Sequence, residues 1–165
     1  MFDVLIIGGG VSGMSCALVL GSAQNKAFAA DKKIGIFTHQ KASNLQDAVF
    51  NNAYGIPAGK LGSELLEESK EQLASLYPHV QQIENEKVMK IEGAYPNFTV
   101  VTNKGSYQTK IIVVAINATN TFAIEGLMEY VIPHKKAIAE KNRIQLKTKT
   151  ISLPTEFTWP EHWQA

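Results

Sequence analysis

The chain has 165 residues, of which 45% are hydrophobic and 19% are charged, and its formal net charge is +1. This length fits one domain with a real core, and the balanced charge argues against a nucleic-acid partner. The single cysteine, Cys16, excludes an internal disulfide and a C-x-x-C redox pair. The apolar start at Phe2 has no basic leader and is broken by glycines well short of a membrane span. We therefore expect a cytoplasmic protein with no membrane partner.

The first predicted unit is a strand, a glycine-rich turn, a helix and a second strand. Residues 3–7 form a short apolar run that ends in glycine, which is typical of a strand buried on both faces of a parallel sheet. From Ser12 to about Ala23, apolar and small residues recur at steps of three and four, so this segment is predicted to be helical. The apolar residues 34–37 supply the second strand, and the crossover between the two strands should be right-handed.

A long loop and a second helix are predicted next. Residues 44–62 have the Gly, Pro and Asn content of a surface or ligand-contacting loop. Ser63 is expected to cap a helix that runs to about Tyr77, where Pro78 ends it. The inner side of this helix is predicted to carry four leucines, namely Leu65, Leu66, Leu73 and Leu76.

Short strands come after this helix, and they are too close together for further helices to intervene. We interpret them as an antiparallel ribbon that feeds one final buried strand at 111–116. Lys104 and Gly105 would make the last turn of the ribbon. After Asn117 the pattern loosens, and only a strand at 143–147 is indicated. The predicted strands of the ribbon are 80–83, 87–92, 98–103 and 106–116.

The glycines between the first strand and the first helix fit the pattern G-x-G-x-x-G at Gly8, Gly10 and Gly13. In this pattern the first glycine permits the tight turn, the second lets a pyrophosphate approach the backbone, and the third lets the helix pack on the strand. The free N–H groups of the first helical turn would face the phosphates. A structural glycine turn is the alternative interpretation. The expected binding turn consists of Gly8, Gly9, Gly10, Val11, Ser12 and Gly13.

The end of the second strand lacks the acidic residue that normally accepts a hydrogen bond from an adenosine ribose. Thr38 occupies that position and is followed by His39 and, two residues later, by Lys41 and then Ser43. Exchanging an acid for these residues removes a repulsive charge and supplies donors, as a 2′-phosphate would require, so NADP is one candidate ligand. An ordinary solvated loop is the other interpretation.

Other candidate chemistry is weaker. Ser12 lies beside glycines, but Met14 breaks the Gly-x-Ser-x-Gly pattern of a hydrolase nucleophile. The four histidines show no metal-ligand spacing, and one cysteine cannot complete a zinc site, so we expect no metal. Cys16 is interpreted as a small buried side chain of the first helix. No side chain is assigned to bond making.

The stretches "DVLIIGGGVSGMSCALVL", "FNNAYGIPAGKLGSELLEESKEQL" and "FTVVTNKGSYQTKIIVVAINA" together resemble the FAD-binding domain of thioredoxin-reductase-like flavoproteins. The resemblance is greatest to short single-domain members, and it covers roughly residues 3–147. It implies FAD as the cofactor, Asn52 as a residue near the flavin, Val88 beside the adenine, and Ala115 at a strand end that touches the cofactor. It also implies an oxidoreductase whose flavin transfers the electrons.

The elements and the resemblance together predict an α/β fold. We expect a Rossmann-like FAD/NAD(P)-binding domain at 1–147, with a parallel sheet, helices on both faces and an antiparallel excursion. The strands at 3–7, 34–37 and 110–116 should be neighbours.

The chain departs from the family beyond residue 147. Residues 148–165 form an atypical tail in which the family's last strand, glycine turn and helix are not recognisable, so we expect a truncated or frame-altered member. The missing redox cysteine pair excludes thioredoxin reduction. A non-catalytic nucleotide-binding remnant or interaction protein is the alternative function. Apolar surface left uncovered at the missing strand and helix would favour a homodimer.

Overall fold

The computed structural model describes residues 1–38, 45–116 and 124–127. Its centre is a six-stranded sheet with the strand order β5-β2-β1-β8-β7-β6. β1 (Phe2–Ile7) lies between β2 (Ile34–Phe37) and β8 (Ser106–Val114) and is parallel to both. The predicted neighbours are therefore confirmed. The expected boundary at residue 147 and the strand at 143–147 lie outside the described residues.

The parallel strands are buried on both faces, and their side chains divide between two apolar clusters. Leu5 and Ile7 of β1 point into one cluster, whereas Ile6 points into the other. This division results from the two-residue period of a strand. The long apolar runs in the sequence thus correspond to strands covered on both sides.

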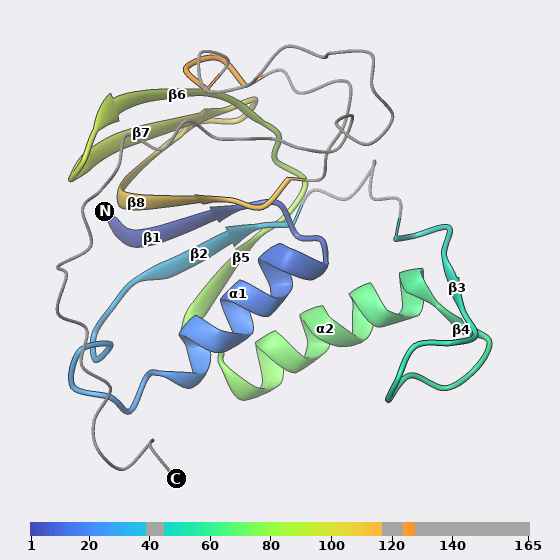
Figure 1. Cartoon of the computed structure of the whole chain (residues 1–165). Coiled ribbons are helices and arrows are strands. Elements are labelled where there is room, and N and C mark those ends of the chain that lie inside the picture. The colour runs from blue at the N-terminus through green and yellow to red at the C-terminus, as the bar shows by residue number, and fades with distance from the viewer. Residues whose placement is uncertain (39–44, 117–123, 128–165) are drawn as a thin grey trace, which may run out of the picture. The chain divides into compact units, whose positions relative to one another are not determined.

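Both described helices pack on the same face of the sheet. α1 (Val11–Ser22) contributes Met14 and Ala17 to the cluster around Ile6 and Ile36, and α2 (Gly62–Leu76) contributes Leu73. Figure 1 shows α1 and α2 side by side under the parallel strands. The sequence predicted helices on both faces; in the described residues the antiparallel strands cover the second face.

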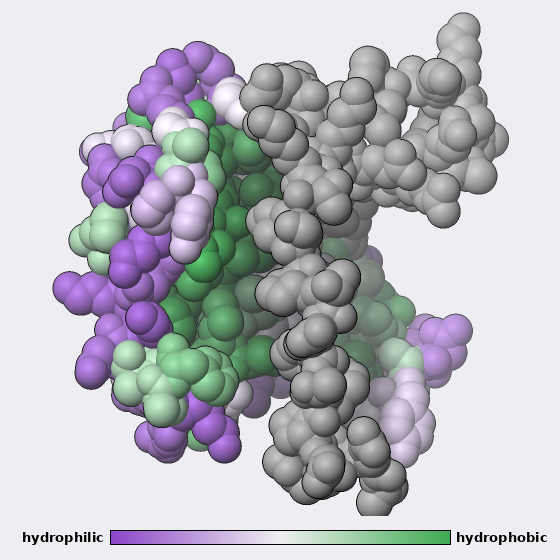
Figure 2. All heavy atoms as spheres, turned by 60° about the vertical axis from the view of Figure 1, so that its left-hand side comes forward, coloured by the Kyte–Doolittle hydropathy of each residue, from purple (hydrophilic) through white to green (hydrophobic). Residues whose placement is uncertain are grey.

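The second face is covered because the antiparallel part of the sheet folds back over the parallel part. β6 (Val88–Ala94) pairs with β7 (Asn97–Thr102), and β7 pairs with the first half of β8. Val88, Ile91 and Val100 of these strands share a cluster with Leu5, Phe37 and Ile83 of the parallel strands. Figure 2 brings forward the left-hand side of Figure 1 and shows hydrophobic residues in the middle of the view, with hydrophilic residues along one side.

β5 (Val80–Ile83) differs from its predicted role. It is the parallel edge partner of β2, with Val80 opposite Ile34 and Ile83 opposite Phe37, rather than part of the antiparallel ribbon. The physical reason is that α2 directly precedes it and is long enough to carry the chain back to the start of the sheet. Connections too short to hold a helix begin only after β5, so the antiparallel ribbon starts at β6.

The segment before α2 is a long connection, as predicted, with a small hairpin in it. β3 (Val49–Phe50) and β4 (Lys60–Leu61) form a two-stranded antiparallel sheet. α2 starts at Gly62, whose amide donates to the Ala48 carbonyl at 2.8 Å. A side chain does not fit there, because a Cβ would lie 1.8 Å from the Leu45 carbonyl oxygen.

Two details of α2 were predicted wrongly. Ser63 does not cap the helix: Leu61 is the N-cap residue, and its amide donates to the Glu64 carboxylate at 3.2 Å. Leu76 is 56% exposed instead of facing inwards. Tyr77 takes the inner position, since its ring lies against Gly21 of α1, where a Cβ would be only 2.8 Å from the ring.

Candidate nucleotide-binding site

The glycine turn joins the carboxyl end of β1 to the amino end of α1. Gly8 has φ +114°, a conformation that side chains disfavour, and a Cβ there would lie 2.6 Å from the Ala115 carbonyl oxygen. A Cβ on Gly13 would lie 1.7 Å from the Gly8 carbonyl oxygen. The predicted roles of Gly8 in the turn and of Gly13 in helix packing are therefore explained by the lack of space at both positions.

The first amides of α1 are left without partners inside the helix. Hydrogen bonding in the helix begins with the Met14 amide, which donates to the Gly10 carbonyl at 2.9 Å. The preceding amides, those of Val11, Ser12 and Gly13, have no acceptor among the described residues. Gly10 is the N-cap residue and has no side chain to satisfy them. A helix start of this kind is suited to an anion, because its N–H groups and the helix dipole point outwards.

Two strand ends flank this turn. Ala115 follows β8, and its amide donates to the Ile7 carbonyl at 2.8 Å, so the end of β8 is fixed beside the end of β1. Thr38 follows β2; its side chain is 4% exposed, and its hydroxyl has no hydrogen-bond partner in the described part of the chain. An unpartnered buried hydroxyl is costly unless a ligand or water satisfies it.

The end of β5 is the part of this edge that the sequence prediction missed. The Thr38 amide donates to the Ile83 carbonyl at 3.0 Å, so β5 ends next to β2. The signal was available: a helix of fifteen residues between two apolar strands is typical of a parallel crossover. The carboxyl ends of the parallel strands β1, β2, β5 and β8 thus meet along one edge of the sheet. Ligands of open α/β sheets bind at the carboxyl ends of the strands.

The remaining predicted residues are spread more widely. Asn52 lies exposed in the connection between β3 and β4, and no described contact joins it to the glycine turn. Val88 begins β6, is 7% exposed and packs in the cluster with Leu5 and Phe37. His39 and Lys41 lie outside the described residues.

Titratable and metal-binding groups near α1 are sparse. Cys16 is partly buried, and this burial raises the pKa of its thiol. A raised thiol pKa makes a poor nucleophile at neutral pH. Among residues 1–38, 45–116 and 124–127, no three His, Cys, Asp or Glu side chains are grouped so that they could hold a metal ion. Neither described helix has the length and hydropathy needed to cross a membrane.

Comparison with known proteins supports this picture. The family model described as "Pyridine nucleotide-disulphide oxidoreductase" matches residues 2–154. No curated protein sequence matches the chain.

Three solved structures illustrate the likeness of fold. An oxidoreductase from Agrobacterium tumefaciens is 24% identical with a TM-score of 0.60, and the match covers 84% of this chain and 41% of that one. Thioredoxin reductase from Streptococcus pyogenes is 27% identical with a TM-score of 0.56, over 69% of this chain and 34% of that one. A ferredoxin-flavin thioredoxin reductase from Clostridium acetobutylicum is 26% identical with a TM-score of 0.54, over 79% and 42%. The chain thus spans less than half the length of these proteins.

The mixed sheet and its glycine turn define an α/β domain of the Rossmann-like class, whose members typically bind FAD or NAD(P). Within that class, the chain belongs to the pyridine nucleotide-disulphide oxidoreductase family. The predicted fold class and the predicted resemblance are both confirmed.

Proposed function

We propose that the chain binds FAD and serves as the flavin-binding part of an oxidoreductase. The observation that carries this proposal is the set of amides at Val11, Ser12 and Gly13, which have no acceptor among the described residues and begin a helix directly after a parallel strand. The diphosphate of a dinucleotide offers the negative charge and the oxygen acceptors that such amides lack.

The described residues around the turn fit such a ligand. The orphaned Thr38 hydroxyl at the end of β2 can donate to, or accept from, a ribose hydroxyl in place of the usual carboxylate. Ala115 has a small side chain and is fixed against the turn. Asn52 near the flavin and Val88 near the adenine remain proposals that rest on the family resemblance.

The protein's own contribution is binding and orientation. When bound, FAD supplies the electron transfer, and no side chain of this chain is assigned to it. The backbone turn would hold the diphosphate, and the buried sheet edge would exclude water from the side of the ligand that faces it.

The test replaces Gly10 with valine. Gly10 has φ −78° and ψ −171°, values that valine adopts readily, so the Gly10→Val chain should fold while its isopropyl group obstructs the diphosphate. Gly105→Val is the matched control, because a Cβ at Gly105 has nothing within 4 Å and the site lies in the β7–β8 turn. FAD binding to the purified full chain is followed by its visible absorbance and fluorescence. We expect about a tenfold or larger loss of affinity for Gly10→Val and none for Gly105→Val.

The same titrations separate FAD from the alternatives. NADP binds in place of FAD if NADP, but not FAD, raises the melting temperature, since a ligand of the native state stabilises it. A chain that neither cofactor stabilises would be a remnant without nucleotide binding. Either outcome, or equal FAD binding by both valine variants, overturns the proposal.

A further inference from the structure

A hollow lies at the edge of the sheet opposite the glycine turn. It has a volume of about 550 Å³ and opens at the amino ends of β1, β2 and β5. This volume is within the range of small-molecule sites. We call it the amino-edge pocket, and the residues that matter to the argument are Phe2, Asp31, Lys33, Ile34, His79 and Gln81.

The strongest feature of the amino-edge pocket is an imidazole without partners. Both ring nitrogens of His79 are buried, and neither has a hydrogen-bond partner among the described residues. The ring meets that of Tyr77 edge-on, with centroids 6.3 Å apart. This aromatic contact satisfies neither nitrogen. Buried polar atoms are normally paired, so the described residues leave this ring without the polar partner that it needs.

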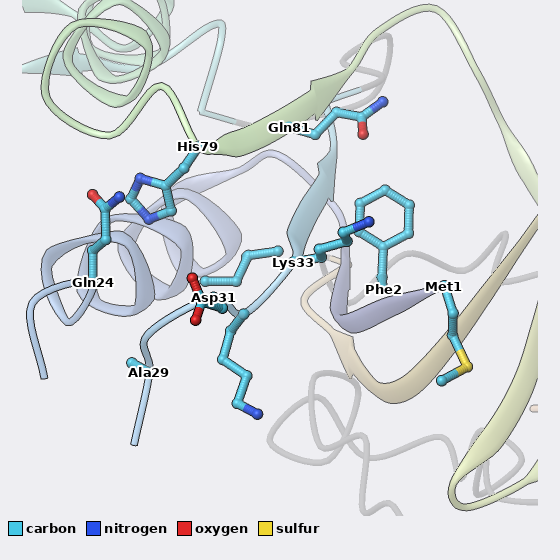
Figure 3. Close-up of a pocket in the computed structure, with 10 residues that line it drawn as sticks. Met1, Phe2, Gln24, Ala29, Asp31, Lys33, His79 and Gln81 are labelled. Carbon is cyan, nitrogen blue, oxygen red and sulfur yellow. The ribbon is translucent and has the colours of Figure 1, made fainter. Parts of the chain in front are cut away.

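The other lining residues of the amino-edge pocket include apolar side chains and lysines. Phe2 and the buried Ile34 supply the apolar surface. Figure 3 shows His79 on one side of the hollow and Phe2 and Gln81 on the other, with the Lys33 side chain beside Phe2. The Lys33 ammonium has no ion-pair partner in the described part of the chain, whereas Lys32 lies 4.0 Å from Asp3.

The charge balance of the pocket favours an anion. Lys32 and Lys33 outnumber Asp31, the acidic residue of the lining. The nearby carboxylate of Asp3 is already paired with Lys110 at 2.7 Å and with the Lys33 amide at 3.0 Å. Asp3 is therefore not available to neutralise Lys33.

We infer that the amino-edge pocket binds a small organic anion that has an apolar body. The anionic group meets Lys33 and accepts from His79, and the apolar body lies against Phe2 and Ile34. This inference does not rest on the proposed function, because the glycine turn is at the opposite edge of the sheet.

The probe is 2-naphthoate, with 2-naphthalenemethanol as its neutral match and inorganic phosphate as an anion without an apolar body. Binding to the full chain is measured by calorimetry and by the proton resonance of the His79 ring, which is assigned by its absence in His79→Phe. We expect naphthoate to bind about tenfold more tightly than either of the other two and to shift the His79 resonance. Equal affinity for the neutral alcohol, or an unmoved His79 resonance, would overturn the inference.

Three variants test the assignment of charges. Lys33→Met should weaken naphthoate binding about two- to fivefold, as expected for a partly solvated charge pair. Asp31→Asn should strengthen it, and the fold should tolerate this change because Asp31 has φ +61°, which asparagine also adopts. Lys104→Met, in the exposed turn beyond β7, is the control and should change nothing. If Lys33→Met and Asp31→Asn bind naphthoate as the control does, or if FAD competes with naphthoate, the pocket is not the binding site.

Discussion

The carbonyl oxygen of Gly8 occupies the space that a side chain on Gly13 would need, because a Cβ built on Gly13 lies 1.7 Å from it. The Gly8 carbonyl and the Gly13 Cα both belong to backbone that is held between β1 and α1, so neither group can move freely. Gly13→Ala should therefore reduce the free energy of unfolding by about 2 kcal/mol or more. Gly105→Ala should stay within about 0.5 kcal/mol of the wild type, since its Cβ meets nothing. Urea unfolding followed by circular dichroism measures both values, and equal stabilities would refute the packing role of Gly13.

Asp3 ties the start of β1 to two other parts of the chain. The hydrogen bond from the Lys110 ammonium, and next the one from the Lys33 amide, lower the pKa of the Asp3 carboxyl. A lowered folded-state pKa stabilises the fold above the unfolded pKa of about 3.9, and this stabilisation is lost as the pH falls through the folded pKa. Asp3→Asn should cost about 1–2 kcal/mol at pH 7. The difference from wild type should shrink towards zero under acidic conditions, and a difference that does not depend on pH would contradict the assignment.

Tyr107 links β8 to the turn before β6. Burial, and next the hydrogen bond from its hydroxyl to Glu86 at 2.9 Å, raise the pKa of Tyr107 above 10. The protonated form is favoured in the folded state, so this contribution is complete below the unfolded pKa and is lost as the pH rises through the folded pKa. Tyr107→Phe should keep the edge-on contact with Phe37 but cost about 1 kcal/mol at neutral pH. An ultraviolet titration should show one late-titrating tyrosine fewer in the variant than in the wild type.

The first half of the fold could be predicted because local signals and long-range pairing agree there. The predicted strands at 3–7 and 34–37 and the helix from Ser12 match β1, β2 and α1 closely. A glycine turn between an apolar run and a helical pattern leaves few alternatives. The pattern therefore located the turn between β1 and α1, whereas the binding role of its residues stays a prediction.

Pairing partners were harder to predict than strands. The apolar residues 80–83 were recognised as a strand, but period-two alternation does not say which strand lies alongside; the preceding crossover helix does. The inner face of α2 was wrong at Leu76 for a similar reason. A leucine at helical spacing points inwards only while there is a surface opposite it, and at this end Tyr77 contacts Gly21 instead. The amino-edge pocket had no sequence signal, because its residues come from three distant segments.

The last turn of α2 contains a matched pair of leucines. Leu73 is fully buried against α1 and the parallel strands, whereas Leu76, three residues further on, is 56% exposed. Leu73→Ala removes apolar contacts and leaves a cavity, so it should lower the free energy of unfolding by about 2–5 kcal/mol. Leu76→Ala deletes the same atoms from a solvated position and should change stability by about 0.5 kcal/mol or less. Chemical unfolding of both variants in the same buffer measures the difference. If Leu76→Ala costs as much as Leu73→Ala, the face of α2 that packs on the sheet is rotated from the one described, and the sequence prediction of an inward Leu76 would be restored.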